Sequence, residues 1–195
     1  MAGRRVLECL LVSGVAYKQI GQMNLALETF QQVEKICRQF ELQSFLSMIY
    51  QNLGTVYSAM NQSDLAVSFF RQAIEYNEQP EDQVYTILSL LRVYEKLGGR
   101  EKICHWLEEG ECILPQLRTP IRQRFETHFD VHRALHEENN ERIEASLLTA
   151  VRYFRKKMDK SQTKHYSRKL AEFYVSKRKY KKAVEYYRQM LSEEV

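Results

Sequence analysis

Three histidines stand four residues apart in the stretch "HFDVHRALH", at positions 128, 132 and 136. In a helix, residues with this spacing lie along one face. Imidazoles in such a row could bind a metal ion, titrate near neutral pH or line a ligand-binding wall. They could equally be part of a hydrophobic core. Which alternative holds depends on the helix that carries the histidines and on what that helix packs against.

On a helical wheel the three histidines share their face with apolar side chains, and charged side chains occupy the opposite face. The apolar neighbours are Ile121, Phe125, Phe129, Val131 and Leu135. The imidazoles therefore face either a core or a binding wall. The repeat register described below favours the wall, because it places four other residues at the positions that pack between helices. These are Thr127, Asp130, Val131 and Ala134, which would make a poor core.

A metal site has little support in the rest of the chain. Zinc needs a third or fourth ligand beside a histidine pair, and no second cluster of metal-binding residue types occurs. The four cysteines form no CxxC pair and are expected to be free thiols: Cys9, Cys37, Cys104 and Cys112. We expect neither a metal nor another cofactor.

One pattern of four residues recurs five times. Its first residue is usually aromatic, and small or apolar residues follow at nine, thirteen and sixteen positions further along the chain. Its first two copies are Tyr17, Ala26, Phe30, Val33 and Tyr57, Ala66, Phe70, Ala73. The later copies begin at Tyr94, Ala134 and Tyr174, so that successive leads lie 40, 37, 40 and 40 residues apart. Polar turns such as "SAMNQSD" separate the two halves of each copy. Each copy predicts a helical hairpin that buries its apolar face only by stacking on its neighbours.

These positions resemble the tetratricopeptide repeat. The clearest copy, "YQNLGTVYSAMNQSDLAVSFFRQAIEYNEQP", carries Leu53, Gly54, Tyr57, Phe70 and Pro80 at the family's spacing. We therefore expect an all-α, right-handed superhelix of about five hairpins in one domain over residues 1–195. The expected repeats cover residues 7–40, 47–80, 84–117, 124–157 and 164–195. The period near 40 departs from the family's usual value of about 34.

A narrower resemblance comes from the last third of the chain. The segments "YSRKLAEFY" and "KYKKAVEYYRQML" are similar to the terminal repeats of Gram-positive peptide-pheromone receptors of the Rap, NprR and PlcR type. That resemblance implies a concave groove that binds a short extended peptide, with Asn side chains on first helices pairing with the peptide backbone. An amide suits this role because it donates and accepts at once.

The same resemblance implies which side chains would face the peptide. They are Gln51, Asn52 and Thr55 in the second repeat, Tyr85, Ser89 and Arg92 in the third, and Arg168, Lys169 and Glu172 in the fifth. The wall alternative adds His128 and His132. Only Asn52 among them is an asparagine, so the match to the family pattern is incomplete.

Charge is concentrated near the C-terminus, where residues 152–188 hold 14 Lys and Arg against 3 Asp and Glu. This block is either a solvated helical face or a surface for an acidic peptide, an acidic protein or nucleic acid. No DNA-binding segment precedes the repeats, so nucleic acid is expected only through a domain absent from this chain. The uncapped ends of the array favour self-association.

The sequence contains no phosphate-binding Gly loop, GxSxG or HExxH motif, and we expect no enzymatic activity. No apolar run is long enough for a membrane span, which predicts a cytoplasmic protein. The hypothesis is a peptide- or protein-binding regulatory domain, the ligand-sensing part of a peptide-responsive regulator. The alternative is a scaffold or dimerisation domain that binds partner proteins constitutively.

Overall fold

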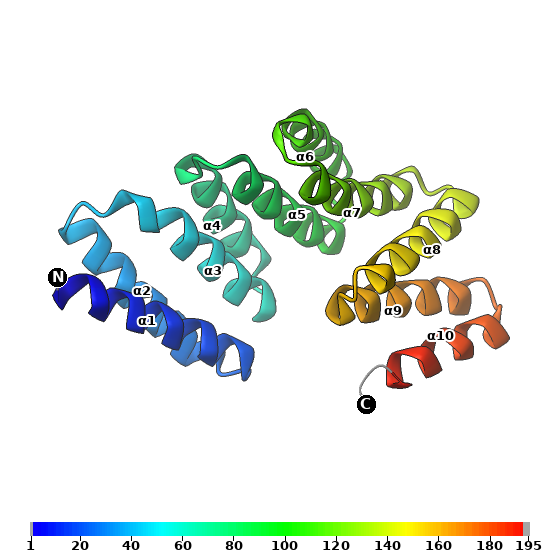
Figure 1. The fold of residues 1–195 in the computed structure, drawn as a ribbon, viewed down its shortest axis with the longest axis horizontal. Coiled ribbons are helices and arrows are strands. Elements are labelled where there is room, and N and C mark those ends of the chain that lie inside the picture. Colours follow the sequence, from blue (N-terminus) through cyan, green and yellow to red (C-terminus); the bar gives the residue numbers. More distant parts are fainter. Residues whose placement is uncertain (1, 193–195) are drawn as a thin grey trace. The chain divides into compact units, whose positions relative to one another are not determined.

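The computed structural model describes residues 2–192, and within them the fold consists of α-helices and two short 3-10 helices without a strand (Figure 1). The first five helices are α1 (Ala2–Gln19), α2 (Met23–Gln39), α3 (Leu46–Ala59), α4 (Ser63–Tyr76) and α5 (Pro80–Leu97). The next five are α6 (Arg100–Ile113), α7 (Thr119–Glu137), α8 (Asn140–Lys156), α9 (Lys160–Ser176) and α10 (Tyr180–Ser192). The 3-10 helices are η1 (Gln43–Phe45) and η2 (Leu114–Gln116).

Consecutive helices pair as hairpins, α1 with α2 through α9 with α10, which confirms the expected all-helical, tetratricopeptide-like fold. The turns contain residues in the left-handed region, where the chain reverses after a helix. Gly21 and Gly98 adopt φ angles of 80° and 70°, and Asn61 adopts 59°. The handedness of the superhelix and the repeat length stay predictions.

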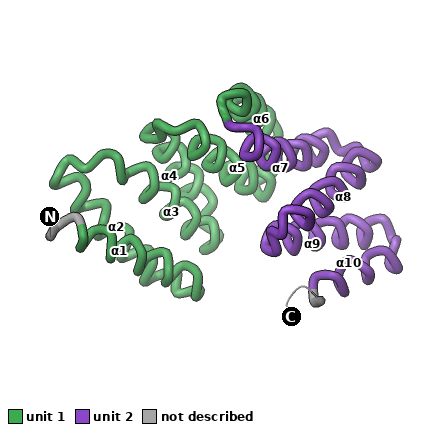
Figure 2. The backbone as a smooth tube through the Cα atoms, viewed as in Figure 1, with its two compact units in different colours: residues 1–117 green, residues 118–195 purple. Residues whose placement is uncertain are grey.

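The chain divides into two compact units, residues 1–117 and residues 118–195 (Figure 2). Each has a hydrophobic core of its own. Whether the chain acts as the single domain predicted above stays a prediction. None of the helices between residues 2 and 192 has both the length and the apolar character that crossing a bilayer requires.

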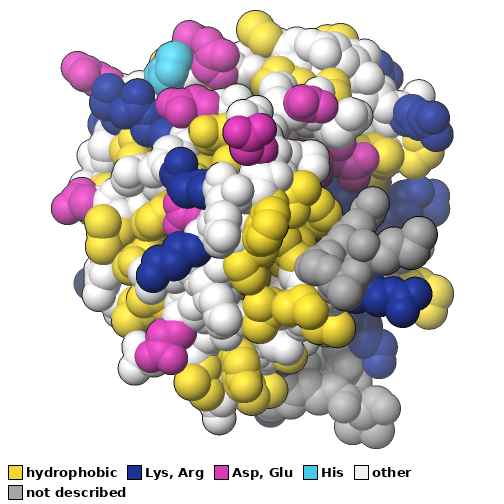
Figure 3. Space-filling view, turned by 90° about the vertical axis from the view of Figure 1, so that its left-hand side faces the viewer, with side chains coloured by type: hydrophobic (Ala, Val, Ile, Leu, Met, Phe, Trp, Pro, Cys, Tyr) yellow, Lys and Arg dark blue, Asp and Glu magenta, His cyan; other side chains and the backbone are white. Residues whose placement is uncertain are grey.

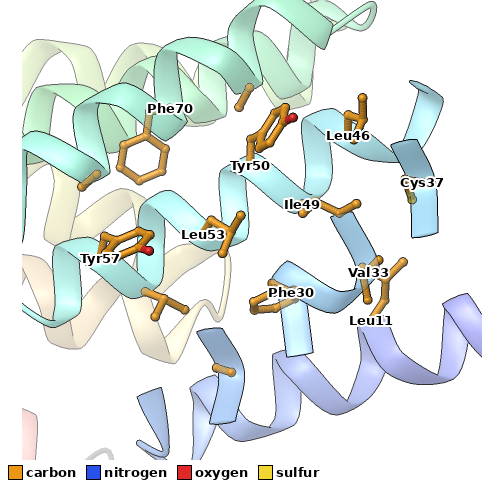
Figure 4. Close-up of a cluster of buried hydrophobic side chains, with 14 of the residues drawn as sticks. Leu11, Phe30, Val33, Cys37, Leu46, Ile49, Tyr50, Leu53, Tyr57 and Phe70 are labelled. Atoms are coloured by element: carbon orange, nitrogen blue, oxygen red, sulfur yellow. The ribbon is translucent and has the colours of Figure 1, made fainter. Parts of the chain in front are cut away.

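Unit 1 (residues 1–117) depends on two close helix crossings that place an aromatic ring over a glycine. Phe30 and Phe70 are buried, and Figure 4 shows both rings in the core that joins α1 to α4. A Cβ atom on Gly54 would lie 2.6 Å from Phe70 Cδ1, and one on Gly14 would lie 2.8 Å from Phe30 Cε1. The glycines at these repeat positions therefore provide the space for the rings.

Unit 2 (residues 118–195) has a core of aromatic rings between α7, α8 and α9. Phe154 and Tyr166 stack with ring centroids 5.5 Å apart and an interplanar angle of 9°. Tyr174 is buried further along α9 against the α10 side chain Tyr186, whose ring centroid is 5.8 Å away. These contacts fix α9 between its two neighbouring helices.

Candidate functional site

The first helices of the three hairpins in unit 1 form one exposed surface, here called the first-helix face, which contains two grooves. The α1–α3 groove has a volume of about 300 Å³ and is lined by Leu11, Val12, Val15, Ala16, Gln19, Met48 and Asn52. The α3–α5 groove has a volume of about 360 Å³, and its lining includes Ser47, Met48, Gln51, Tyr76, Asp82 and Tyr85. Met48 belongs to both linings, so the grooves are neighbours across α3.

Three predicted contact residues meet in or beside the α3–α5 groove. Gln51 Nε2 donates to Ser89 Oγ over 3.1 Å, which joins α3 to α5. The Tyr85 side chain is 55% exposed and lines the groove. Gln51 Oε1 is buried with no hydrogen-bond partner among the residues that the structure describes. This oxygen is an acceptor to which the described part of the fold supplies no donor.

The loop between α4 and α5 closes one end of this groove through Asn77, which sequence reasoning missed. Asn77 is buried and donates from Nδ2 to Thr86 Oγ1 over 3.1 Å, while Ser47 Oγ bonds its Oδ1. Gln83 Nε2 donates to the Asn77 carbonyl over 2.9 Å. Asn77 lies outside the recurring repeat positions, and only its place shortly before Pro80 marks it as a turn residue.

Tyr76, on the α3–α5 groove, packs against a polar cluster on the other side of α3. Its ring centroid lies 5.7 Å from that of Tyr50, whose hydroxyl donates to Glu34 Oε1 over 3.1 Å and accepts from Arg38. Burial and the nearby Glu34 carboxylate raise the pKa of Tyr50 to about 12. Tyr50 therefore stays a neutral hydrogen-bond donor at physiological pH.

Asn52 lies in the lining of the α1–α3 groove with its amide already engaged. It is 9% exposed, donates from Nδ2 to the Met48 carbonyl over 2.8 Å and accepts at Oδ1 from Lys18 Nζ over 2.6 Å. Thr55, one turn further along α3, donates to the Gln51 carbonyl over 2.8 Å. Asn52 thus keeps one N–H for a ligand and uses its acceptor inside the fold.

Arg92 is the last predicted contact residue of unit 1. Its side chain is partly exposed on α5, and its Nε is buried without a hydrogen-bond partner in the described part of the chain. It does not line either groove. Of the predicted contact residues on α5, Tyr85 therefore lines a groove and Arg92 does not.

The histidines that open the fourth hairpin are deeply placed in unit 2. His128 and His132 are 3% and 2% exposed, and His136 is partly exposed. The His128 Nδ1 atom is hydrogen-bonded to the Tyr166 hydroxyl, and its ring centroid lies 4.9 Å from that of Phe154. A side chain this buried reaches a ligand only if helices move, so a peptide contact for His128 and His132 stays a prediction.

The histidine row does not gather further metal-binding side chains around it. Among the described residues, no group of three or more His, Cys, Asp and Glu is placed to hold a metal ion. The chemistry of His128 seen here is a hydrogen bond to a phenol within an aromatic core.

The three α9 residues of the predicted groove are near the surface. Arg168 and Glu172 are exposed, and Lys169 is partly exposed. Elsewhere in the basic block, Lys179 and Lys182 donate to Glu144 over 3.2 and 3.3 Å, and Arg155 donates to Gln189 over 2.8 Å. Part of the excess positive charge is therefore used to hold α10 against α8.

Family comparison agrees with this architecture. Residues 6–79 and residues 168–194 match models described as tetratricopeptide repeat. The chain belongs to the tetratricopeptide-repeat family. The transcriptional activator NprA of Geobacillus stearothermophilus is 24% identical over 192 residues, which are 95% of this chain and 47% of NprA. The chain thus spans about half the length of this curated relative.

Solved structures of similar fold include two Rap proteins. The apo form of RapI gives a TM-score of 0.83 at 16% identity, covering 98% of this chain and 69% of RapI. The Rap conjugation gene regulator of the plasmid pLS20, in complex with the Phr* peptide, gives 0.75 at 21% identity, covering 98% and 53%. At these identities the likeness establishes the fold alone.

Proposed function

We propose that this chain binds a short peptide on the first-helix face of unit 1 and forms the ligand-sensing part of a peptide-responsive regulator. The observation that carries the proposal is the pair of neighbouring grooves across α1, α3 and α5, which share Met48. Gln51, Asn52 and Tyr85, identified by repeat position, line them. Support also comes from the similar fold of a Rap regulator solved with its peptide and from the relative named as a transcriptional activator.

The chemistry of the face fits an extended peptide. The α1–α3 groove offers aliphatic walls for an apolar side chain. Asn52 retains an N–H for a peptide carbonyl, and the unpaired Gln51 Oε1 could accept from a peptide N–H once its amide turns toward the α3–α5 groove. Tyr85 offers an exposed ring with little side-chain entropy to lose on binding.

The proposed output is a population shift. A peptide that touches α1, α3 and α5 together contacts three hairpins and favours the arrangement in which all three contacts are made. Thr55, Ser89 and Arg92, on α3 and α5 of unit 1, belong to the same proposal as secondary positions. For the unit 2 residues a peptide contact stays a separate prediction: Arg168, Lys169, Glu172, His128 and His132. The effect would pass to whatever domain or partner the repeats contact.

A second candidate is a constitutive scaffold or dimerisation domain. It is favoured by apolar side chains left exposed on α1 and in the turn that follows it, where Val6, Val12 and Ile20 are 55%, 70% and 67% exposed. Figure 3 shows hydrophobic side chains gathered on one face of the molecule. Exposed apolar patches of this kind are typical of protein interfaces.

Affinity selection from a synthetic heptapeptide library, read by mass spectrometry, tests peptide binding. We expect retained peptides whose affinity falls on the order of tenfold in Tyr85→Ala, because aromatic anchors dominate such interfaces. Tyr180→Ala is the matched control, since Tyr180 is similarly exposed at 60% but lies on α10. Retention of no peptide, together with a dimer in sedimentation, would favour the scaffold.

A further inference from the structure

The α9–α10 hairpin of unit 2 exposes four large apolar side chains, here called the α9–α10 stripe. They are Val175, Tyr180, Val184 and Tyr187. The last three follow one another on α10 at the spacing i, i+4 and i+7, which places side chains along one side of a helix. The stripe is therefore a continuous apolar surface on α10 rather than a scatter of single residues.

The earlier hairpins show what kind of element covers such a stripe. Tyr187 is 38% exposed, but it occupies the repeat position of Phe30 and Phe70, which are 0% and 2% exposed. Phe30 lies in one buried cluster with Ile49 and Leu53 of α3, the first helix of the next hairpin (Figure 4). At this position the protein itself buries an aromatic ring under a helix.

Two more members of the stripe occupy positions that connect one hairpin to the next. Val184 occupies the repeat position of Glu144, which accepts hydrogen bonds from side chains of the following hairpin. Val175 occupies the position of Lys18, whose Nζ donates to Asn52 of the following hairpin. The structural complement of the stripe is therefore a helix that packs as a following first helix does.

The charges beside the stripe specify the flanks of that helix. Lys181 and Arg188 are exposed and lie seven residues apart on α10, each directly after a tyrosine of the stripe, and Arg178 is exposed in the adjoining turn. No ion pair reaches these three cations from the residues that the structure describes. Along α10, three Lys and Arg stand against one carboxylate, that of Glu185. Acidic flanks are therefore attracted to this surface and basic flanks are repelled.

The same charges disfavour a second copy of the chain as the occupant. Helix α1 also exposes apolar side chains, but it carries three Lys and Arg against one Glu. Two basic helices would repel each other. An apolar centre with a charged rim is typical of a protein interface, so the surface fits a different protein.

We propose that the α9–α10 stripe binds an amphipathic helix of a partner protein, with the apolar side of that helix on the stripe and acidic residues beside Lys181 and Arg188. The helix lies in a groove of the repeat array, a common mode of peptide recognition. This surface belongs to unit 2, so its occupancy does not depend on peptide binding in unit 1.

The test offers the full chain a synthetic library of amphipathic peptides roughly five helical turns, or about 18 residues, long. Leu is fixed at helical spacing, and Glu, Gln and Lys vary at the flanking positions. Retained peptides are quantified by mass spectrometry. We expect Glu to be enriched over Lys on the order of tenfold. Combining Lys181→Glu with Arg188→Glu should reverse this preference, which a merely structural role of the two residues would not do.

The matched control combines Lys35→Glu with Lys96→Glu, at exposed lysines of unit 1, and should keep the preference for Glu. Tyr187→Ser should lower retention of the acidic helices on the order of tenfold, because aromatic anchors dominate such interfaces. Should that variant not fold, the charge reversal at two exposed side chains still decides.

Two single variants separate this proposal from the peptide-binding proposal. Tyr180→Ala should lower retention of the acidic helices and leave the heptapeptides retained, whereas Tyr85→Ala should do the opposite. Absence of retained helices, or a preference for Glu that survives the charge reversal, would overturn the inference. A dimer in sedimentation that Tyr187→Ser dissociates would assign the stripe to a second copy instead. Pelleting with phosphatidylserine vesicles that the charge reversal abolishes would assign it to a lipid surface.

Discussion

At the residue scale, Glu144 links the α9–α10 hairpin to α8. It accepts from the Tyr174 hydroxyl over 2.9 Å and from Lys179 and Lys182. The Tyr174 hydrogen bond, followed by the two lysines, holds the pKa of this carboxyl below its usual value near 4.5. A lowered pKa in the folded state means that the stabilisation is present at neutral pH and is lost as the pH falls through the folded pKa.

Glu144→Gln should therefore lower the free energy of unfolding at pH 7 and make it less sensitive to acid than in the wild type. Urea unfolding at pH 7 and at about pH 3.5 measures both effects, since the wild type loses this contribution below about pH 5. Glu172→Gln, on the exposed side of α9, is the control and should leave the acid sensitivity unchanged. An unaltered pH dependence in Glu144→Gln would show that its partners contribute nothing to stability.

At the element scale, the crossing of α3 and α4 requires that Gly54 have no side chain. Gly→Ala in a helix ordinarily stabilises it by up to about 1 kcal/mol. Here the added Cβ would lie 2.6 Å from the buried Phe70 ring, so Gly54→Ala should instead destabilise by about 1–3 kcal/mol. Urea unfolding measures the sign, and Ser68→Ala on the exposed side of α4 serves as the control.

The same crossing offers a second variant that isolates the cause. Combining Gly54→Ala with Phe70→Leu should recover part of the lost stability, because the smaller side chain no longer meets the added Cβ. A stabilised Gly54→Ala variant, or independent effects in the double variant, would mean that the two helices do not depend on this close approach.

At the scale of the whole molecule, the two units have separate cores, and within each unit a helix packs chiefly against its neighbours along the chain. Chains built this way open locally, because few contacts connect distant segments. Hydrogen exchange read by mass spectrometry should show faster exchange in α1–α4 for Gly54→Ala and unchanged exchange in α8–α10. Equal acceleration across the chain would indicate one cooperative unit.

The sequence by itself determined the class of fold and the pairing of helices. The recurring positions of Tyr57, Ala66 and Phe70 indicate which side of each helix is buried. The polar segments indicate where the chain turns between two helices. Both signals are local patterns in the sequence. The same periodicity placed Gln51 and Tyr85 on the first helices, where they line a groove.

Only the tertiary structure decided how the polar residues on those faces are satisfied. Periodicity shows that His128 lies on an apolar face, but its hydrogen bond comes from Tyr166, 38 residues away. Likewise Asn52 has its acceptor occupied by Lys18, 34 residues earlier in the chain. Such partners depend on which helices pack together and on how far each is shifted along its neighbour. The packing of all the helices involved sets both, so a local sequence pattern does not reveal them.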